Sequence, residues 1–380
     1  MSTLLIIGTF EALFLTLLVA GMKNKNKSSL FLGLIFLVVG LTIGLAYLQY
    51  YNMHNGFPIP WALNISFIFM FLHGPALWFY IKSLSVDGLH FKPVYLLHFL
   101  PFFIFFAIQY RLFIILEPSE KIQIVLSESF KNTNFYKISV RCIGLSTISY
   151  YLWGLKQVSD HRHNLKQYFS RIDDKDLNWL RILIIASLIT YGSNHLLFNL
   201  DLVFHFASFM GLMMLTYGFG SIYILVLGFF GLRQGNICIR TDKYEHGQKL
   251  KQEHHLPNQE KKRTDDERNF AHSLLEYMES KQAFLDPEIT LSVLASQMKV
   301  QPDYLSGILN GSLKVNFFDF INGLRIEEFK TQVTDEKNSH LSIMGIAYNS
   351  GFNSKAAFYR AFHKKENISP GDYIKGLSGK

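Results

Sequence analysis

The sequence predicts an all-α protein in two parts, a polytopic membrane helix bundle of about seven helices followed by a soluble all-α domain. Three observations support this fold class. Of the 380 residues, 49% are apolar and only 17% are charged, well below the ~25% of soluble proteins. The long apolar runs are confined to residues 1–232. Beyond them the chain is polar, and its apolar residues recur at the three-to-four spacing of surface helices.

A membrane-spanning helix needs about 20 mainly apolar residues, because lipid offers no partner for backbone N–H and C=O groups. We identify seven such runs, and the last is expected to begin a little later than its first apolar residue. They are residues 4–22, 30–50, 61–81, 93–116, 135–155, 179–200 and 205–230. Tyr and Trp cluster near their ends, as they do at membrane interfaces.

Lysine and arginine are unevenly distributed among the loops between these runs. The first, third and fifth loops carry ten of them, the second and sixth carry none, and the fourth carries only Lys121 and Lys131. The ten are Lys23, Lys25, Lys27, Lys82, Lys92, Lys156, Arg162, Lys166, Arg171 and Lys175. Because basic loops stay in the cytoplasm, we expect a multi-pass protein of the cell inner (cytoplasmic) membrane, with its N-terminus outside and its soluble domain in the cytoplasm.

Several ionisable or polar side chains lie within the apolar runs, where they are costly and often functional. The expected topology places Arg111, Arg141, Asn194 and His195 towards the outer ends of their helices, where they could line a pocket for an anionic or polar ligand. The alternative is that the arginines extend to the interface and the other two hydrogen-bond between helices. Glu11, in mid-span, is compatible with a sensing role or with a buried helix-packing pair. These five residues are the candidate ligand-sensing set.

Gly40 and Gly44 form a G-x-x-x-G pattern in the second run. This pattern permits close helix contact. Packing within the chain is the favoured interpretation, and a homodimer face is the alternative.

Residues 233–266 are polar, without apolar periodicity, and predict a cytoplasmic linker. Cys142 and Cys238 lie in different parts of the chain and have no metal-binding spacing. The pair His254–His255 has no further ligands at suitable spacing. We therefore expect no disulfide framework, no metal and no cofactor.

From Phe270 the chain takes a helical pattern, with Leu274, Leu275 and Met278 on one face and acidic residues 265–267 near its start. A pair of short helices follows at residues 289–310. Thr290 is suited to cap the first of the pair, and its apolar face carries Leu291, Leu294, Ala295 and Met298. Pro302 is suited to the first turn of the second helix. This is the pattern of a helix-turn-helix.

A longer helix over about residues 317–333 then acts as a spacer, and a second unit repeats the design. Ser342 caps its first helix, Gly351 allows a positive φ in the turn, and Ser354 caps its second helix. Ser369 and Pro370 open a short final helix. The soluble part is therefore predicted to be an all-α double helix-turn-helix domain.

The chain at this point resembles the AraC/XylS family of transcription regulators. The motifs that carry the resemblance are L-x-x-L-A at 291–295, Y-L-S at 304–306, L-R-I-E-E at 324–328, I-A at 346–347, G-F-N-S-K-A-A-F-Y-R-A-F at 351–362 and I-S-P-G-D-Y at 368–373. The likeness covers about residues 270–374. By architecture, the preceding half resembles the seven-helix membrane variety of such regulators.

The resemblance implies two recognition helices about one helical turn (~34 Å) apart, which enter successive major grooves of double-stranded DNA. Carried over by position, the base-facing residues are Asp303, Ser306, Gly307 and Asn310 in the first helix and Lys355, Ala356, Tyr359 and Arg360 in the second. Gly307 departs from the pattern, since relatives often carry a long polar side chain there. Glycine cannot contact a base edge, which puts direct base recognition by the first unit in question.

Charge favours the second unit as the main binder of phosphate. Residues 282–336 contain four basic and eight acidic residues, whereas residues 337–380 contain seven basic and two acidic ones. The electrostatic part of DNA binding depends on Lys and Arg. We therefore expect Lys355, Arg360, Lys364 and Lys365 to contact DNA, although a solvated basic face is the alternative.

Taken together, these patterns predict a membrane-bound, DNA-binding transcription regulator whose sequence-specific binding is controlled by a sensed signal. Its expected domains are residues 1–232 (sensor), 233–266 (linker) and 267–380 (DNA-binding). Expected partners are double-stranded DNA, the lipid bilayer, an unknown small-molecule or envelope signal, and a second copy in a homodimer. The alternative function is a receptor or transporter whose C-terminal domain binds a protein. An enzyme is not expected, because the sequence has no P-loop, H-E-x-x-H or G-x-S-x-G motif.

Overall fold

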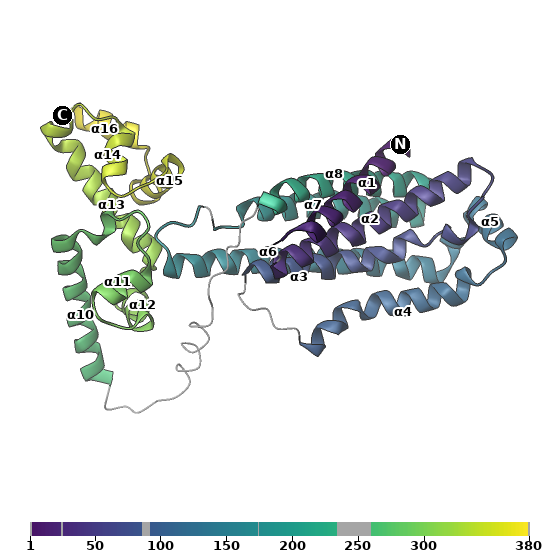
Figure 1. Cartoon of the computed structure of the whole chain (residues 1–380), viewed down its shortest axis with the longest axis horizontal. Helices are drawn as coiled ribbons and strands as arrows, with labels where there is room; N and C mark the ends of the chain where they lie inside the picture. Colours follow the sequence, from purple (N-terminus) through teal and green to yellow (C-terminus); the bar gives the residue numbers. More distant parts are fainter. Residues whose placement is uncertain (1, 24–25, 86–91, 174, 234–259, 379–380) are drawn as a thin grey trace. The chain divides into compact units, whose positions relative to one another are not determined.

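The computed structural model describes residues 2–23, 26–85, 92–173, 175–233 and 260–378 (Figure 1). Of residues 260–265 it describes only the backbone. Within these ranges the chain is helical and contains no β-strand beyond a single bridge between Phe169 and Thr290. The expected all-α class is confirmed. The chain divides into two compact units. The first comprises Met1–Ser159 and Leu177–Thr241, and the second comprises Asp160–Asp176 and Asp242–Lys380.

The first unit opens with two long helices, α1 (Ser2–Gly21) and α2 (Lys27–His54), which coincide with the first two expected runs. They pack closely at small residues. A Cβ atom added to Gly40 would lie 2.8 Å from Cβ of Ala12, and one added to Gly44 would lie 3.2 Å from Cγ2 of Thr9. The G-x-x-x-G pattern therefore mediates packing within the chain, as favoured from the sequence.

The third and fourth runs were each expected to form one helix, and the structure corrects this. The third begins with 3₁₀ turns, η1 (Pro60–Ala62) and η2 (Ser66–Leu72), and only then becomes α3 (His73–Ser85). The fourth consists of η3 (Pro93–Phe99), α4 (Leu100–Gln109) and the π-helical η4 (Tyr110–Ile114). Proline cannot donate a backbone hydrogen bond, so Pro75 and Pro101 interrupt the α-helical ladder where α3 and α4 begin.

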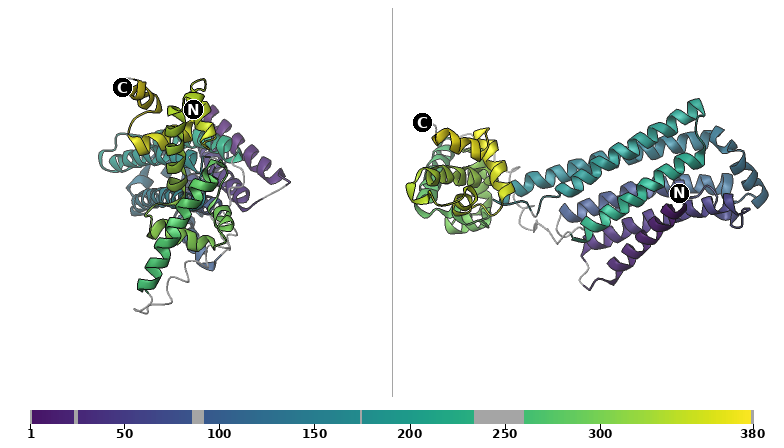
Figure 2. Two further views of the ribbon diagram at one scale, coloured as in Figure 1. Left: turned by 90° about the vertical axis from the view of Figure 1, so that its left-hand side faces the viewer. Right: turned by 90° about the horizontal axis from the view of Figure 1, so that it is seen from above.

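The fourth loop contains the helix α5 (Pro118–Leu126) and the turn η5 (Ser129–Asn132). Three long helices follow. They are α6 (Asn134–Tyr168), α7 (Asn178–Phe204) and α8 (Phe209–Arg233). The late start of α8 agrees with the expectation for the seventh run. Figure 2 shows these helices running side by side as a bundle.

Among the described residues, six helical segments are long and apolar enough to cross a membrane, one fewer than the seven runs expected. In this count η2 and α3 form one segment, Ser66–Leu84, and η3, α4 and η4 form another, Pro93–Ile114. The missing one is the run at 135–155, which lies within α6. This helix is 35 residues long, but Lys137, Arg141 and several hydroxyl side chains lower its mean hydropathy. Length alone would let α6 span a bilayer.

The second unit contains nine helical elements after residue 260 in the described part of the chain. They are α10 (Glu260–Lys281), η8 (Ala283–Leu285), α11 (Leu291–Gln297), α12 (Pro302–Gly311), α13 (Phe317–Thr334), η9 (Glu336–Asn338), α14 (Ile343–Asn349), α15 (Lys355–Glu366) and α16 (Pro370–Ser378). Helix α10 begins five residues before the acidic group that was expected to mark its start. On α10, Leu274 and Met278 are fully buried, but Leu275 is exposed, contrary to the expected face.

Two apolar cores hold the second unit together, and α13 contributes to both. Phe317 and Ile321 pack with α10, α11 and α12 in the first core. Ile326 and Phe329 pack with α14 and α15 in the second. The expected spacer helix therefore joins the two helix pairs through its own buried stripe. Figure 1 shows α13 between the two pairs.

Candidate nucleic-acid interface

The first helix pair is built by the local chemistry that the sequence predicted. The side chain of Thr290 accepts a 3.2 Å hydrogen bond from the backbone N–H of Val293 at the start of α11. Pro302 occupies the first turn of α12. That helix buries Leu305, Ile308 and Leu309. Its opposite face is left to the candidate base-facing residues, of which Asp303, Gly307 and Asn310 are exposed and Ser306 is half-buried.

The second pair repeats this construction. Ser342 accepts a hydrogen bond from Gly345 N–H at 3.0 Å, and Ser354 accepts one from Ala357 N–H at 3.1 Å. Gly351, in the turn between α14 and α15, has φ of +92°. Helix α15 buries Phe358 and Phe362. The candidate contacts lie on its outer surface, where Lys355, Ala356, Arg360, Lys364 and Lys365 are exposed and Tyr359 is half-buried.

Two basic side chains of α15, Lys364 and Lys365, are held by partners within the second unit. Lys364 Nζ lies 2.7 Å from Oδ1 of Asp319. Lys365 Nζ lies 2.6 Å from Oε1 of Glu327 and donates to the backbone carbonyl of Gly323 at 2.8 Å. These are exposed ion pairs, which contribute little free energy in water. A phosphate could therefore replace the carboxylates at small cost.

Sequence reasoning missed the contribution of residues 160–176 to this surface. The carboxylate of Asp173 pairs with the guanidinium of Arg360 and accepts a 3.2 Å hydrogen bond from Oγ of Ser354. Oε1 of Gln167 accepts a 2.9 Å hydrogen bond from Nδ2 of Asn310. The candidate recognition faces of α12 and α15 are thus both in contact with this segment. No pattern in the sequence indicated such a contact, because the partners lie more than 140 residues apart.

Arg325 was part of a recognised motif, but its role was not predicted. Its side chain is buried and donates to the backbone carbonyls of Phe284 and Asp286, each at 2.7 Å. Burial lowers the pKa of Arg325 to about 10, against the opposing effect of Asp286 and Glu288. The guanidinium remains charged at neutral pH, and it joins α13 to the segment that precedes α11.

The candidate ligand-sensing residues are only partly brought together. Asn194 and His195, on α7, line one cavity of the first unit together with aromatic residues such as Tyr136 and Tyr217. Asn194 is buried, and its Nδ2 donates to Oγ1 of Thr216, while its Oδ1 has no hydrogen-bond partner in the structure. Three of the five residues do not line this cavity. Arg111 and Arg141 are exposed, and Glu11 is half-buried in α1.

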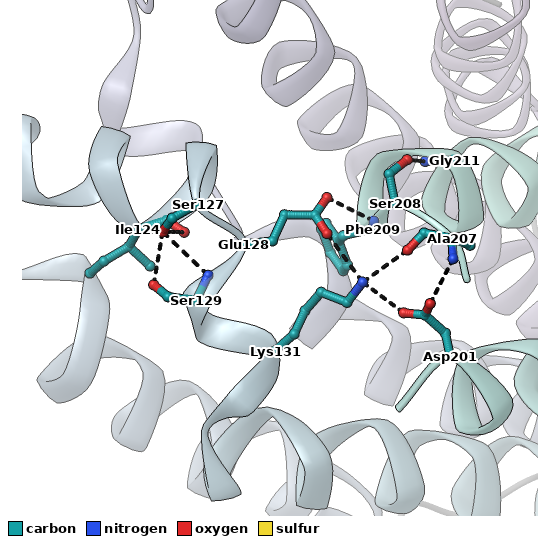
Figure 3. A network of polar contacts seen from close by, with 10 residues as sticks. All are labelled: Ile124, Ser127, Glu128, Ser129, Lys131, Asp201, Ala207, Ser208, Phe209 and Gly211. Atoms are coloured by element: carbon teal, nitrogen blue, oxygen red, sulfur yellow. Dashed lines mark hydrogen bonds and ion pairs between the residues drawn. The ribbon is translucent and has the colours of Figure 1, made fainter. Parts of the chain in front are cut away.

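A second polar cluster in the first unit also escaped prediction (Figure 3). Nζ of Lys131, in the expected fourth loop, lies 2.7 Å from Oδ2 of Asp201 and 3.1 Å from Oε2 of Glu128. Oε1 of Glu128 accepts from Phe209 N–H at 2.9 Å, and Oδ1 of Asp201 accepts from Ala207 N–H at 2.8 Å. Each ionised group has several partners, so the cluster fastens the η5 turn to the connection between α7 and α8.

Three predicted features lie outside the described residues. They are Cys238, the pair His254–His255 and most of the expected linker.

Comparison with known proteins assigns this architecture to a class. Residues 294–376 match a family described as a helix-turn-helix domain. The C-terminal part of the chain is therefore a helix-turn-helix module. It is of the AraC type, as the sequence motifs indicated.

Two curated relatives share this region. The melibiose operon regulatory protein of Escherichia coli (strain K12) is 29% identical over 90 residues, which are 24% of this chain and 29% of that protein. The uncharacterized HTH-type transcriptional regulator YtdP of Bacillus subtilis (strain 168) is 26% identical over 88 residues, which are 23% of this chain and 11% of that protein. The match thus spans less than a third of either relative. No solved structure matches the chain.

Proposed function

We propose that the protein is a membrane-bound transcription regulator that binds specific sequences in double-stranded DNA through its tandem helix-turn-helix units. The observation that carries this proposal is the pair of capped helix-turn-helix units on one spacer helix, α13, each with a polar outer face on its second helix. The match of residues 294–376 to a helix-turn-helix family supports it independently. The names of the relatives, an operon regulator and a transcriptional regulator, point to the same activity.

Within this proposal the exposed side chains have different roles. Phosphate contacts fix position, and contacts to base edges give specificity. We assign base contacts to the outer faces of α12 and α15, with Asp303, Ser306 and Asn310 on the first and Lys355, Ala356, Tyr359 and Arg360 on the second. Lys364 and Lys365 are assigned to phosphate. Gly307 has open space around it and no side chain to offer, so α15 is the main specificity element.

Membrane attachment is supported by the outward faces of the first unit. Large apolar side chains are exposed along several helices, among them Phe10 (67%) on α1, Leu145 (70%) on α6 and Val203 (67%) on α7. Soluble proteins rarely expose such continuous apolar surface. Lipid would cover it. The domains we propose are residues 1–232 in the membrane, 233–266 as a linker and 267–380 for DNA binding.

The proposed orientation places the N-terminus outside and the DNA-binding domain in the cytoplasm. The uneven distribution of Lys and Arg supports this orientation. Residues Asp160–Asp176 share a compact unit with the helix-turn-helix domain, and two helices, α7 and α8, separate these parts along the chain. Two crossings would return the chain to the same side, which agrees with the proposal.

Signal sensing is proposed for the cavity that Asn194 and His195 line. An uncharged acceptor, Oδ1 of Asn194, lies in it without a partner. A buried acceptor of this kind favours a ligand with a hydrogen-bond donor. An unknown small-molecule or envelope signal and a second copy of the chain are the further partners that the sequence predicts.

Genome-wide mapping of DNA sites bound by the full-length chain in its host tests the proposal. We expect a limited set of enriched sites that share a sequence motif. The matched control is a chain with Lys355→Ala and Arg360→Ala, which should lose the enrichment while remaining in the membrane fraction. Absence of enriched sites, together with recovery of a specific protein partner of the C-terminal domain, would favour the alternative of a receptor or transporter.

A further inference from the structure

Residues Asp160–Asp176, the end of α6 and the connection to α7, form part of the same compact unit as the helix-turn-helix domain. We call them the docking segment. They are far from that domain in sequence, and their contacts with it are specific.

The docking segment is anchored where the two helix-turn-helix units meet. Ser170 is buried, its Oγ donates to the carbonyl of Ile289 at 2.7 Å, and its own carbonyl accepts from Nδ2 of Asn322 at 3.1 Å. Ile172 is buried beside it. Arg171 adds an ion pair to Glu288 at 2.6 Å. These contacts hold the segment against the start of the first helix pair and against the spacer helix α13.

From this anchor the segment reaches the outer faces of both proposed recognition helices. Asp173 pairs with Arg360 on α15 and accepts the 3.2 Å hydrogen bond from Ser354, the residue that caps α15. Gln167 accepts the 2.9 Å hydrogen bond from Asn310 on α12. Arg360 and Asn310 are among the residues to which we assigned base contacts. Each present bond occupies an N–H donor of its side chain and places the docking segment against the face to which we assigned base contacts.

The charge of the segment reinforces this conflict. DNA is a dense polyanion that binds through Lys and Arg. The carboxylate of Asp173 occupies the guanidinium of Arg360 and places a negative charge where DNA would approach. The docked segment and a duplex therefore compete for the same groups.

We propose that the docking segment is an autoinhibitory partner of the helix-turn-helix domain, which occupies the DNA-recognition side chains until it is released. The inference rests on the proposed DNA-binding function. The segment is also the covalent link between α6 and α7, and these two helices supply most of the polar lining of the cavity around Asn194. Because the segment is continuous with both helices, we infer that a ligand that shifts α6 relative to α7 would release the segment from the helix-turn-helix domain.

The test compares variants of the full-length chain, reconstituted in lipid, for binding to a duplex that carries a mapped site. Asp173→Asn removes the charge that holds Arg360, and Gln167→Ala removes the contact with Asn310 without a change in charge. We expect each to bind the duplex about 2- to 5-fold more tightly than the wild type, because the contact that each variant removes is exposed to solvent. Asp160→Asn is the matched control, because Asp160 is an exposed carboxylate of the same segment, and it should bind like the wild type.

A second measurement separates release of the segment from a simple effect of charge on DNA affinity. Because coupling is reciprocal, DNA should displace the segment, and amide hydrogen exchange of residues 165–173 should rise when the duplex is added to the wild type. Equal affinities for the wild type and all three variants, or no rise in exchange on binding, would overturn autoinhibition while leaving DNA binding intact. Failure of every chain to bind the duplex would overturn the proposed function itself.

Discussion

Nε of Arg325 donates a 2.7 Å hydrogen bond to the backbone carbonyl of Phe284. The two residues belong to different parts of the second unit, since Arg325 lies in the middle of α13 and Phe284 lies in the η8 turn before the first helix pair. A Cβ atom added to Gly351 would lie 2.7 Å from the same oxygen. The carbonyl of Phe284 therefore lies where the spacer helix α13, the start of the first helix pair and the turn of the second helix pair meet.

Replacing Arg325 with Met is expected to destabilise the second unit by about 2–4 kcal/mol, because the carbonyls of Phe284 and Asp286 would lose their donor inside the protein. Chemical denaturation of the full-length chain in detergent, followed by proteolysis of the C-terminal part, measures the effect. Arg360→Met is the control, since its side chain is exposed, and it should leave the denaturation midpoint nearly unchanged. Equal midpoints for the two variants would show that the buried hydrogen bonds contribute little.

Gly351→Ala is expected to destabilise the second helix-turn-helix by about 2 kcal/mol or more. Its φ of +92° is strained for any residue with a side chain, and the new Cβ would meet the backbone at 2.7 Å and 2.9 Å. Gly307→Ala is a matched control, for which the expected change in stability has the opposite sign. Gly307 lies within α12 with open space around it, so alanine should stabilise the helix by roughly 0.5–1 kcal/mol. A stabilising effect at both positions would contradict the described turn.

The caps and turns of the helix-turn-helix units could be predicted because their chemistry is local. Thr290, Ser342 and Ser354 each bond to a backbone N–H three residues ahead, and Gly351 adopts its φ within one turn. The stripe of α13 could be predicted in the same way from its periodicity. Each of these signals lies within a single helix or turn.

The contacts that could not be predicted are long-range. Lys131 meets Asp201 across 70 residues, and Asp173 meets Arg360 across 187. Hydropathy and loop charge predict a number of crossings and their direction, but they do not show which loop folds onto which domain. The same limit explains the candidate sensing set. Arg141 and Asn194 were grouped because both were expected to lie at a similar depth in the membrane, but of these two only Asn194 lines the cavity.

Topology is tested by reporter fusions after Asn55, Ser129 and Arg171. The proposed orientation predicts that the first two report the outside and the third reports the cytoplasm. The third is the decisive one, because it depends on whether α6, the least apolar of the long helices in the first unit, crosses the membrane. A fusion after Lys23 should also report the cytoplasm and serves as the control for α1. An outside signal after Arg171 would remove α6 from the spanning set and contradict the cytoplasmic placement of the docking segment.

The two helix-turn-helix units are expected to contribute unequally to DNA binding, and single substitutions on α12 and α15 test this. Arg360→Ala should cost at least ~1 kcal/mol of binding free energy at the mapped site and relax specificity at one base position, because arginine to guanine is the commonest specific contact. Since Arg360 also holds Asp173, the loss is best measured in the Asp173→Asn background, where the docking segment no longer masks it. Ser306→Ala on α12 should cost less.

Lys364 distinguishes phosphate contacts from base contacts. Its ion pair with Asp319 is exposed, so the ammonium group is free to exchange a carboxylate for a phosphate. Lys364→Ala should weaken binding to all sequences alike and reduce the salt dependence of log K by about one unit of slope, whereas Arg360→Ala should also change which sequence is preferred. Binding across a salt series, with the mapped duplex and a scrambled one, separates the two effects. If Ser306→Ala proves more damaging than Arg360→Ala in the same series, with both variants folded, then α12 is the principal reader, and the inference from the acidic character of residues 282–336 is wrong.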